Sequence, residues 1–69
     1  MILVVSRFVI RVGFVVRVWD FETGEILLRD DAVQWTHVLA IREDVARTYY
    51  DRPVHFLEVS ADQVRVAGD

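Results

Sequence analysis

The sequence predicts a small α+β domain: a small antiparallel β-sheet with one amphipathic helix packed on one face, in the order β-β-α-β-β. Three observations predict this fold. Apolar residues alternate along residues 2–19, they recur at helical spacing along residues 31–52, and turn-forming residues separate these segments from shorter apolar runs. Because a chain of 69 residues is long enough for only one small core, we expect residues 1–69 to form a single domain.

Residues 2–19 are expected to form one long strand that bends at Gly13. Almost every even position of this segment is apolar, whereas three of its odd positions hold arginine. A two-residue hairpin at residues 12–13 would mix these two sets on each face of the sheet, which is unfavourable. A bend or bulge at Gly13 keeps the sets apart, and a three-residue hairpin is the alternative.

The residues after Trp19 predict a turn followed by a strand over residues 25–30. Asp20 can accept a hydrogen bond from the backbone two residues further on, and Gly24 can adopt a positive φ angle. Because apolar residues flank this turn on both sides, we expect the flanking segments to pair as a hairpin.

Residues 31–52 are expected to form the helix. Asp31 and Gln34 have the spacing of a capping box, and Pro53 ends the segment. A strand over residues 33–41 also fits a period of two, but the cap and an unbroken apolar arc favour the helix. The residues of this arc are Trp35, Val38, Leu39, Ile41, Val45, Ala46 and Tyr49.

Two further strands, residues 54–59 and 63–67, are expected to complete the sheet. Both segments are rich in residues that favour strands, and Ser60, Ala61 and Asp62 between them are typical of a turn.

The composition argues against an enzyme, a metal site and a membrane span. The chain has no cysteine, no glycine-rich phosphate loop and no HExxH motif, and its two serines lie in no nucleophile motif. Arginines interrupt the apolar N-terminal run at positions that a membrane span would bury. We therefore expect a non-enzymatic, soluble, cytoplasmic protein with no cofactor and no membrane association.

The odd positions of residues 7–19 form the main candidate interaction surface. One helix covers only one face of a sheet, so the other face keeps its valines and tryptophan available to a partner. Protein interfaces favour aromatic residues and arginine. The sequence therefore predicts a homodimer, or contact with another protein, through this face or through an exchanged first strand. The predicted contact residues are Arg7, Val9, Arg11, Val15, Arg17 and Trp19.

Charge is unevenly distributed along the chain, whose net charge is −3. Residues 1–19 hold three arginines and no acid, and all eleven acidic residues follow. The acidic side of the helix is a second candidate contact, suited to a basic partner. Its residues are Glu43, Asp44, Tyr50 and Asp51.

Three other interpretations stay open. The arginines can lie on a solvated face and pair with acids of neighbouring strands. With Trp19 they can bind nucleic acid, although three cations on a net-negative chain are few. The chain can also be a structural subunit of a larger assembly. Among binding proteins, small phage- or mobile-element-encoded modulators of host proteins have this size and composition, and we expect a role of that kind.

Overall fold

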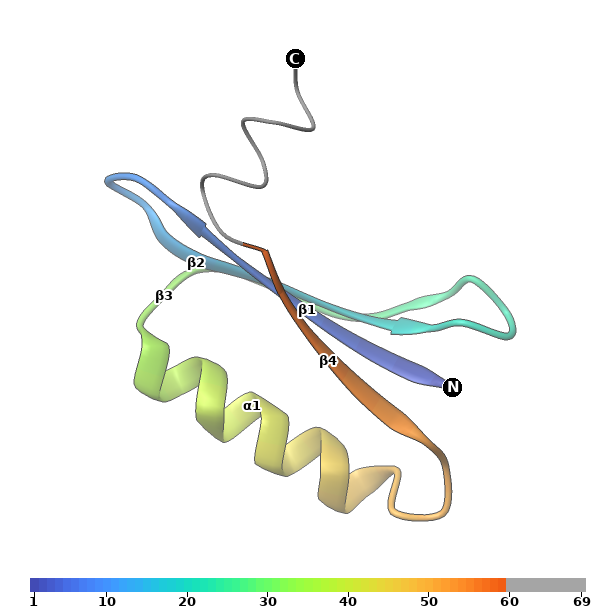
Figure 1. The fold of residues 1–69 in the computed structure, drawn as a ribbon. Helices are drawn as coiled ribbons and strands as arrows, with labels where there is room; N and C mark the ends of the chain where they lie inside the picture. The colour runs from blue at the N-terminus through green and yellow to red at the C-terminus, as the bar shows by residue number, and fades with distance from the viewer. Residues whose placement is uncertain (60–69) are drawn as a thin grey trace.

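A computed structural model of the chain describes residues 1–59 (Figure 1). Within them, a four-stranded sheet carries one helix. The elements are β1 (Ile2–Val9), β2 (Gly13–Asp20), β3 (Ile26–Val33), α1 (Trp35–Thr48) and β4 (Val54–Val59). The predicted α+β class is therefore confirmed, but three strands rather than two precede the helix. The strand expected over residues 63–67 lies outside the described residues.

The segment predicted as one long bent strand is two strands joined by a tight hairpin, so that prediction is wrong. Residues 10–12 form the loop, and the backbone N–H of Val12 donates to the carbonyl of Val9 over 3.1 Å. Because the loop has three residues, even positions of β1 pair with even positions of β2. The alternation stays in phase through the turn, and for that reason it does not distinguish this hairpin, the alternative considered above, from a bend.

Gly13 and Arg11 have backbone conformations that most residues avoid. The φ angle is 106° at Gly13 and 69° at Arg11. A Cβ atom on Gly13 would lie 2.9 Å from the carbonyl oxygen of Val33 on β3. The start of β2 therefore approaches β3 this closely only because residue 13 has no side chain.

The turn between β2 and β3 confirms the prediction for this segment. Gly24 has a φ angle of 76°, and its N–H donates to the carbonyl of Asp20 over 2.8 Å. The following strand extends to Val33, three residues beyond the predicted range of 25–30.

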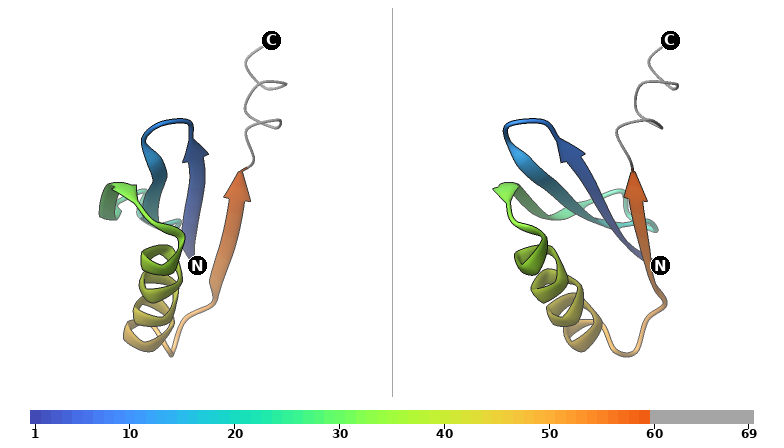
Figure 2. Two further views of the ribbon diagram at one scale, coloured as in Figure 1. Left: turned by 90° about the vertical axis from the view of Figure 1, so that its left-hand side faces the viewer. Right: turned by 60° about the vertical axis from the view of Figure 1, so that its left-hand side comes forward.

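The sheet is mixed, so the prediction of an antiparallel sheet is wrong. The strand order is β3-β2-β1-β4, and β4 runs parallel to β1, from Val54 beside Ile2 to Val59 beside Arg7. Helix α1 carries the chain from β3 at one edge of the sheet to β4 at the other (Figures 1 and 2). Such a crossover lets the next strand run in the same direction as the strand before the helix. Alternation along a strand does not encode where the chain re-enters the sheet.

Helix α1 confirms the predicted helix but is shorter than residues 31–52. Asp31 belongs to β3, and its carboxylate accepts a hydrogen bond from Arg17 over 2.7 Å instead of capping the helix. Gln34 is the N-cap residue and makes no side-chain capping bond, and the helix ends at Thr48. The predicted capping box is therefore wrong, because a neighbouring strand supplies a stronger partner for the Asp31 carboxylate.

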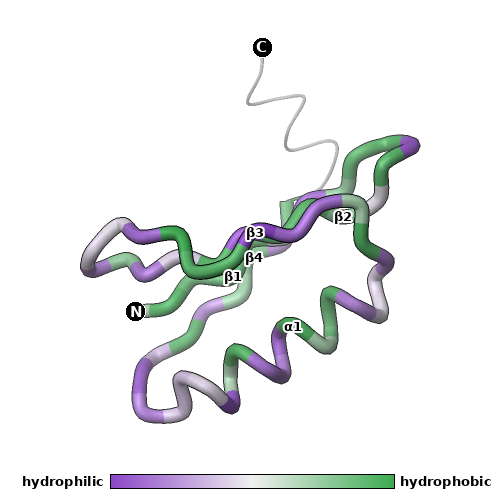
Figure 3. Tube along the Cα trace, turned by 180° about the vertical axis from the view of Figure 1, so that it is seen from behind, coloured by the Kyte–Doolittle hydropathy of each residue, from purple (hydrophilic) through white to green (hydrophobic). Residues whose placement is uncertain are grey.

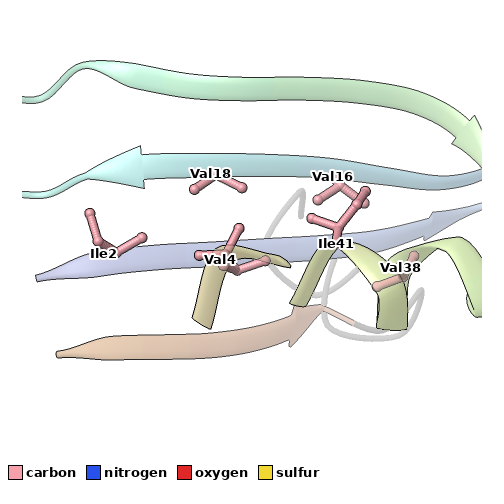
Figure 4. Packing of buried hydrophobic residues seen from close by; sticks show 7 residues of the cluster. Ile2, Val4, Val16, Val18, Val38 and Ile41 are labelled. Atoms are coloured by element: carbon pink, nitrogen blue, oxygen red, sulfur yellow. The ribbon is translucent and has the colours of Figure 1, made fainter. Parts of the chain in front are cut away.

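The hydrophobic core lies between α1 and one face of the sheet (Figure 4). Hydrophobic and hydrophilic residues alternate along α1, as expected of an amphipathic helix (Figure 3). Trp35 and Tyr49 pack at the margin of the core, whereas Leu39 and Ala46 of the predicted apolar arc are exposed. We call this sheet face the covered face; it presents Ile2, Val4, Ser6, Val16, Val18 and Asp20, and α1 presents Val38, Ile41 and Val45.

The two buried polar residues of the covered face differ in how their oxygens are satisfied. Asp20 accepts hydrogen bonds from the backbone N–H of Glu22 (3.0 Å) and from Arg52 Nη2 (3.1 Å). Burial alone would raise the pKa of Asp20, but these hydrogen bonds, the charge of Arg52 and the backbone N–H of Thr23 together lower it below its ordinary value. By contrast, the buried hydroxyl of Ser6 has no hydrogen-bond partner in the described part of the chain.

Candidate interaction surface

The face of the sheet opposite α1 is the candidate functional site. Within residues 1–59 no helix or strand lies over it (Figures 1 and 3). Because side chains alternate across a strand, the odd positions of β1 and β2 lie here, together with the residues of β4 that pair with them. We call this the open face; its side chains on these three strands are Leu3, Val5, Arg7, Val9, Val15, Arg17, Trp19, His55, Leu57 and Val59.

Strand pairing brings residues that are far apart in the sequence together on the open face. Val5 lies between Leu57 of β4 and Arg17 of β2, and Arg17 lies beside Arg29 of β3. Leu57 exposes 49% of its surface, while Val5 and Arg17 are half-buried. Leu57 was not among the predicted contact residues, because the parallel pairing that places it beside Val5 leaves no signal in the periodicity.

A shallow hollow of about 320 Å³ lies on the open face. It is lined by Val5, Arg7, Val15, Arg17, Trp19 and Val59. Four of the six contact residues predicted from sequence therefore meet here. The hollow combines apolar side chains with guanidinium groups and contains no nucleophile, so its chemistry suits non-covalent contact.

The other two predicted residues, Val9 and Arg11, lie away from this hollow. Val9 is the last residue of β1, and Arg11 is exposed in the hairpin loop that follows. The arginines also differ in their partners: Arg17 pairs with Asp31 over 2.7 Å, whereas exposed Arg7 makes no ion pair within the described segment. The pairing of Arg17 is the arrangement that the solvated-face interpretation expects.

The acidic residues predicted as a second contact do not share one helix face. Glu43 and Asp44 lie on α1 and line a groove of about 560 Å³ between the helix and β3. Tyr50 and Asp51 follow the end of the helix, in the turn that leads to β4, where Tyr50 is 85% exposed. Tyr50 and Asp51 are therefore not on the helix face to which we assigned them, because the helix ends earlier than predicted.

The histidine and acidic side chains of the described residues do not gather as a metal site would require. Within residues 1–59 no three such groups lie together, and His37 Nε2 instead contacts Asp30 Oδ2 over 3.1 Å. No helix in this part of the chain is long and apolar enough to cross a membrane. Comparisons with protein families, with curated proteins and with solved structures find no match to this chain.

Proposed function

We propose that this chain is a small, non-enzymatic protein-binding protein that acts as a homodimer through its open face. The observation that carries the proposal is that α1 covers one side of the sheet, while the other side presents Val5, Trp19 and Leu57. Removing apolar surface from water contributes roughly 25 cal/mol for each Å² buried, so a second copy placed on this face would stabilise both chains.

The size and charge of the open face fit a second copy of the chain. The described residues extend over 36 × 25 × 15 Å, and a face with the two longer dimensions is large enough for the roughly 800 Å² per partner of a standard interface. Arg7 and the largely exposed carboxylate of Asp31 give this side of the sheet both signs of charge. Two copies related by a two-fold axis can therefore offer opposite charges to each other.

Light scattering after size exclusion tests the homodimer. We expect twice the 8.0 kDa of one chain for the wild type, and 8.0 kDa for Leu57→Glu, which places a charge on the open face. Leu39→Glu is the matched control, because Leu39 is 42% exposed on α1, on the other side of the sheet, and this variant should stay dimeric. A wild-type mass of 8.0 kDa at millimolar concentration would exclude the homodimer.

Nucleic-acid binding is the second candidate function. Arg17 and Arg29 are paired across β2 and β3, and Arg7 adds a further cation to the same face as Trp19. Such a surface can hold phosphates and stack a base, but Asp31 already pairs with Arg17. Anisotropy of a labelled 12-nucleotide single strand distinguishes the two: salt-sensitive binding that Arg7→Glu abolishes would favour nucleic acid over protein.

The proposed binding activity suggests a biological role and a cellular location for the protein. A small binding protein without catalytic groups suits a modulator of a host protein, such as phages and mobile elements encode, and a cytoplasmic location is part of this proposal. A structural subunit would differ in one respect: capture with tagged protein from cells of the native host would yield a fixed assembly rather than one regulated partner.

A further inference from the structure

Arg42 occupies an unusual aromatic setting on the side of the sheet that carries α1. Its guanidinium carbon lies 5.0 Å from the centre of the Trp35 ring and 5.4 Å from the centre of the Phe56 ring. Trp35 begins α1 and Phe56 lies on β4, so two different elements hold the cation in place. Cations at these distances from aromatic rings are attracted by the ring quadrupole.

The aromatic surface continues from Trp35 towards the β1–β2 hairpin. The ring of Phe14 lies 5.1 Å from that of Trp35, and Phe8 lies 5.3 Å from Phe14 in an edge-to-face arrangement. Phe8 and Phe56 remain 45% and 46% exposed. Of the two rings that lie beside Arg42, that of Phe56 is therefore still in contact with water, and exposed Phe8 lies two rings beyond Trp35.

Arg42 differs from the two other half-buried arginines of residues 1–59. Arg17 pairs with Asp31 over 2.7 Å, and Arg52 pairs with Asp20 over 3.1 Å. Arg42 makes no ion pair with any described residue, and its buried Nε has no hydrogen-bond acceptor there. The buried Nε is closed to an outside group, but the two Nη groups, which have no partner among the described residues either, can bind a carboxylate through two parallel hydrogen bonds.

We propose that Arg42, Trp35 and Phe56 form a receptor for a carboxylate carried on an apolar segment of a partner protein. The cation supplies the charge that a carboxylate requires, and exposed Phe56 and Leu39, which lies three residues before Arg42 on α1, supply apolar surface beside it. Arginine and tryptophan together are typical of the residues that dominate binding energy at interfaces. A single arginine on a chain of net charge −3 suits one carboxylate better than a polyanion.

This receptor, the Arg42 site, lies on the opposite side of the sheet from the open face, and it does not depend on the homodimer. The two tryptophans make the two surfaces separable in one experiment. Trp35 belongs to the Arg42 site and Trp19 to the open face, so their indole N–H signals in a ¹H–¹⁵N NMR spectrum report on each surface.

The first test titrates ¹⁵N-labelled full-length protein with the peptide acetyl-Leu-Glu-Leu-amide. We expect saturable shifts of the Arg42 Nε–H and Trp35 indole signals, with an affinity of about 1 mM for so small a probe. The matched peptide acetyl-Leu-Gln-Leu-amide, which lacks the charge, should bind at least tenfold more weakly. Equal binding of the two peptides, or shifts confined to Trp19, would overturn the proposal.

Variants of two arginines on α1 distinguish binding at the Arg42 site from a general effect of the protein's net charge. Arg42→Gln should weaken binding of the Glu peptide at least tenfold, and Arg42→Lys should weaken it as well, because lysine lacks the planar fork. Arg47→Gln removes the same charge from an exposed position of the same helix and should bind like the wild type. An unchanged Trp19 signal shows that each variant is folded.

Two further measurements test whether inorganic phosphate or a carboxylate of this chain occupies the Arg42 site instead. Phosphate that binds as tightly as the Glu peptide would show that the apolar surroundings add nothing, and would overturn the proposed partner. A shift of the Arg42 Nε–H signal in Asp62→Asn or Asp69→Asn without peptide would show that the chain supplies its own carboxylate. That result would also exclude an external partner as the occupant.

Discussion

The two faces of the sheet carry similar apolar side chains but differ in what lies over them. Val16 and Val15 are neighbours on β2; Val16 is fully buried beneath α1, whereas Val15 is half-buried on the open face. Alternation alone separates the two faces, and the path of the helix decides which of them becomes the core. On a face without a helix, the apolar side chains stay in contact with water. Covering them with a partner would therefore yield the same kind of free energy that the helix provides on the covered face.

The largest expected change in stability comes from shortening Val16, and the same substitution at Val15 provides the comparison. Val16→Ala should lower the free energy of unfolding by about 2–3 kcal/mol, since it removes buried methyl groups and leaves a cavity. Val15→Ala should cost less than about 1 kcal/mol in the monomer, because water already reaches this side chain. Urea unfolding of dilute protein measures both values, and equal losses would show that the open face is itself packed as a core.

A second prediction concerns the hairpin that keeps the two faces in phase. Gly13→Ala should lower the free energy of unfolding by about 1–3 kcal/mol, because φ is 106° and the new Cβ would meet the Val33 carbonyl oxygen at 2.9 Å. Gly24→Ala is the control: it has a positive φ of 76° but no atom within 4 Å of the added Cβ. A smaller loss there, in the same urea titration, isolates the contact with β3.

The sequence predicts the faces well and the connections poorly, for physical reasons. Burial of alternate residues such as Val16 and Val18 follows from side-chain geometry along a single strand. The loop at residues 10–12 is invisible to that pattern, because an odd number of loop residues preserves the phase. Asp31 has the sequence signature of a helix cap, and only the neighbouring strand shows that Arg17 takes its carboxylate.

The Arg42 site illustrates the same limit on what a sequence can predict. Trp35 belongs to the predicted apolar arc of the helix, and Phe56 to a predicted strand, but their common contact with Arg42 depends on β4 re-entering the sheet beside β1. Contacts made through such a crossover join residues that no local pattern relates.

A third and smaller effect concerns the unsatisfied hydroxyl on the covered face. Ser6→Ala should raise the free energy of unfolding by about 1 kcal/mol, because a buried hydroxyl without a partner loses its hydration and gains nothing in return. Thr23→Ala should lower it by about 0.5 kcal/mol, since the Thr23 hydroxyl accepts a hydrogen bond from the N–H of Glu25. A loss of stability in Ser6→Ala would contradict the structure, because it would require a hydrogen bond that the described residues do not provide.

The smallest expected effect concerns Asp20, the satisfied polar residue of the same face, and appears only in acid. Because its folded-state pKa is lowered below 3.8, the carboxylate stabilises the fold above that pH, and this contribution is lost as pH falls through the folded-state pKa. Asp20→Asn should therefore be less stable than the wild type at pH 7 and approach it in acid, as measured by the urea midpoint. The matched variant Asp51→Asn removes an exposed carboxylate that makes no ion pair within residues 1–59, and it serves as the control for the loss of one negative charge. If the urea midpoints of both variants change with pH in the same way, the hydrogen bonds from Glu22 and Arg52 do not make the stability of the fold depend on the charge of Asp20.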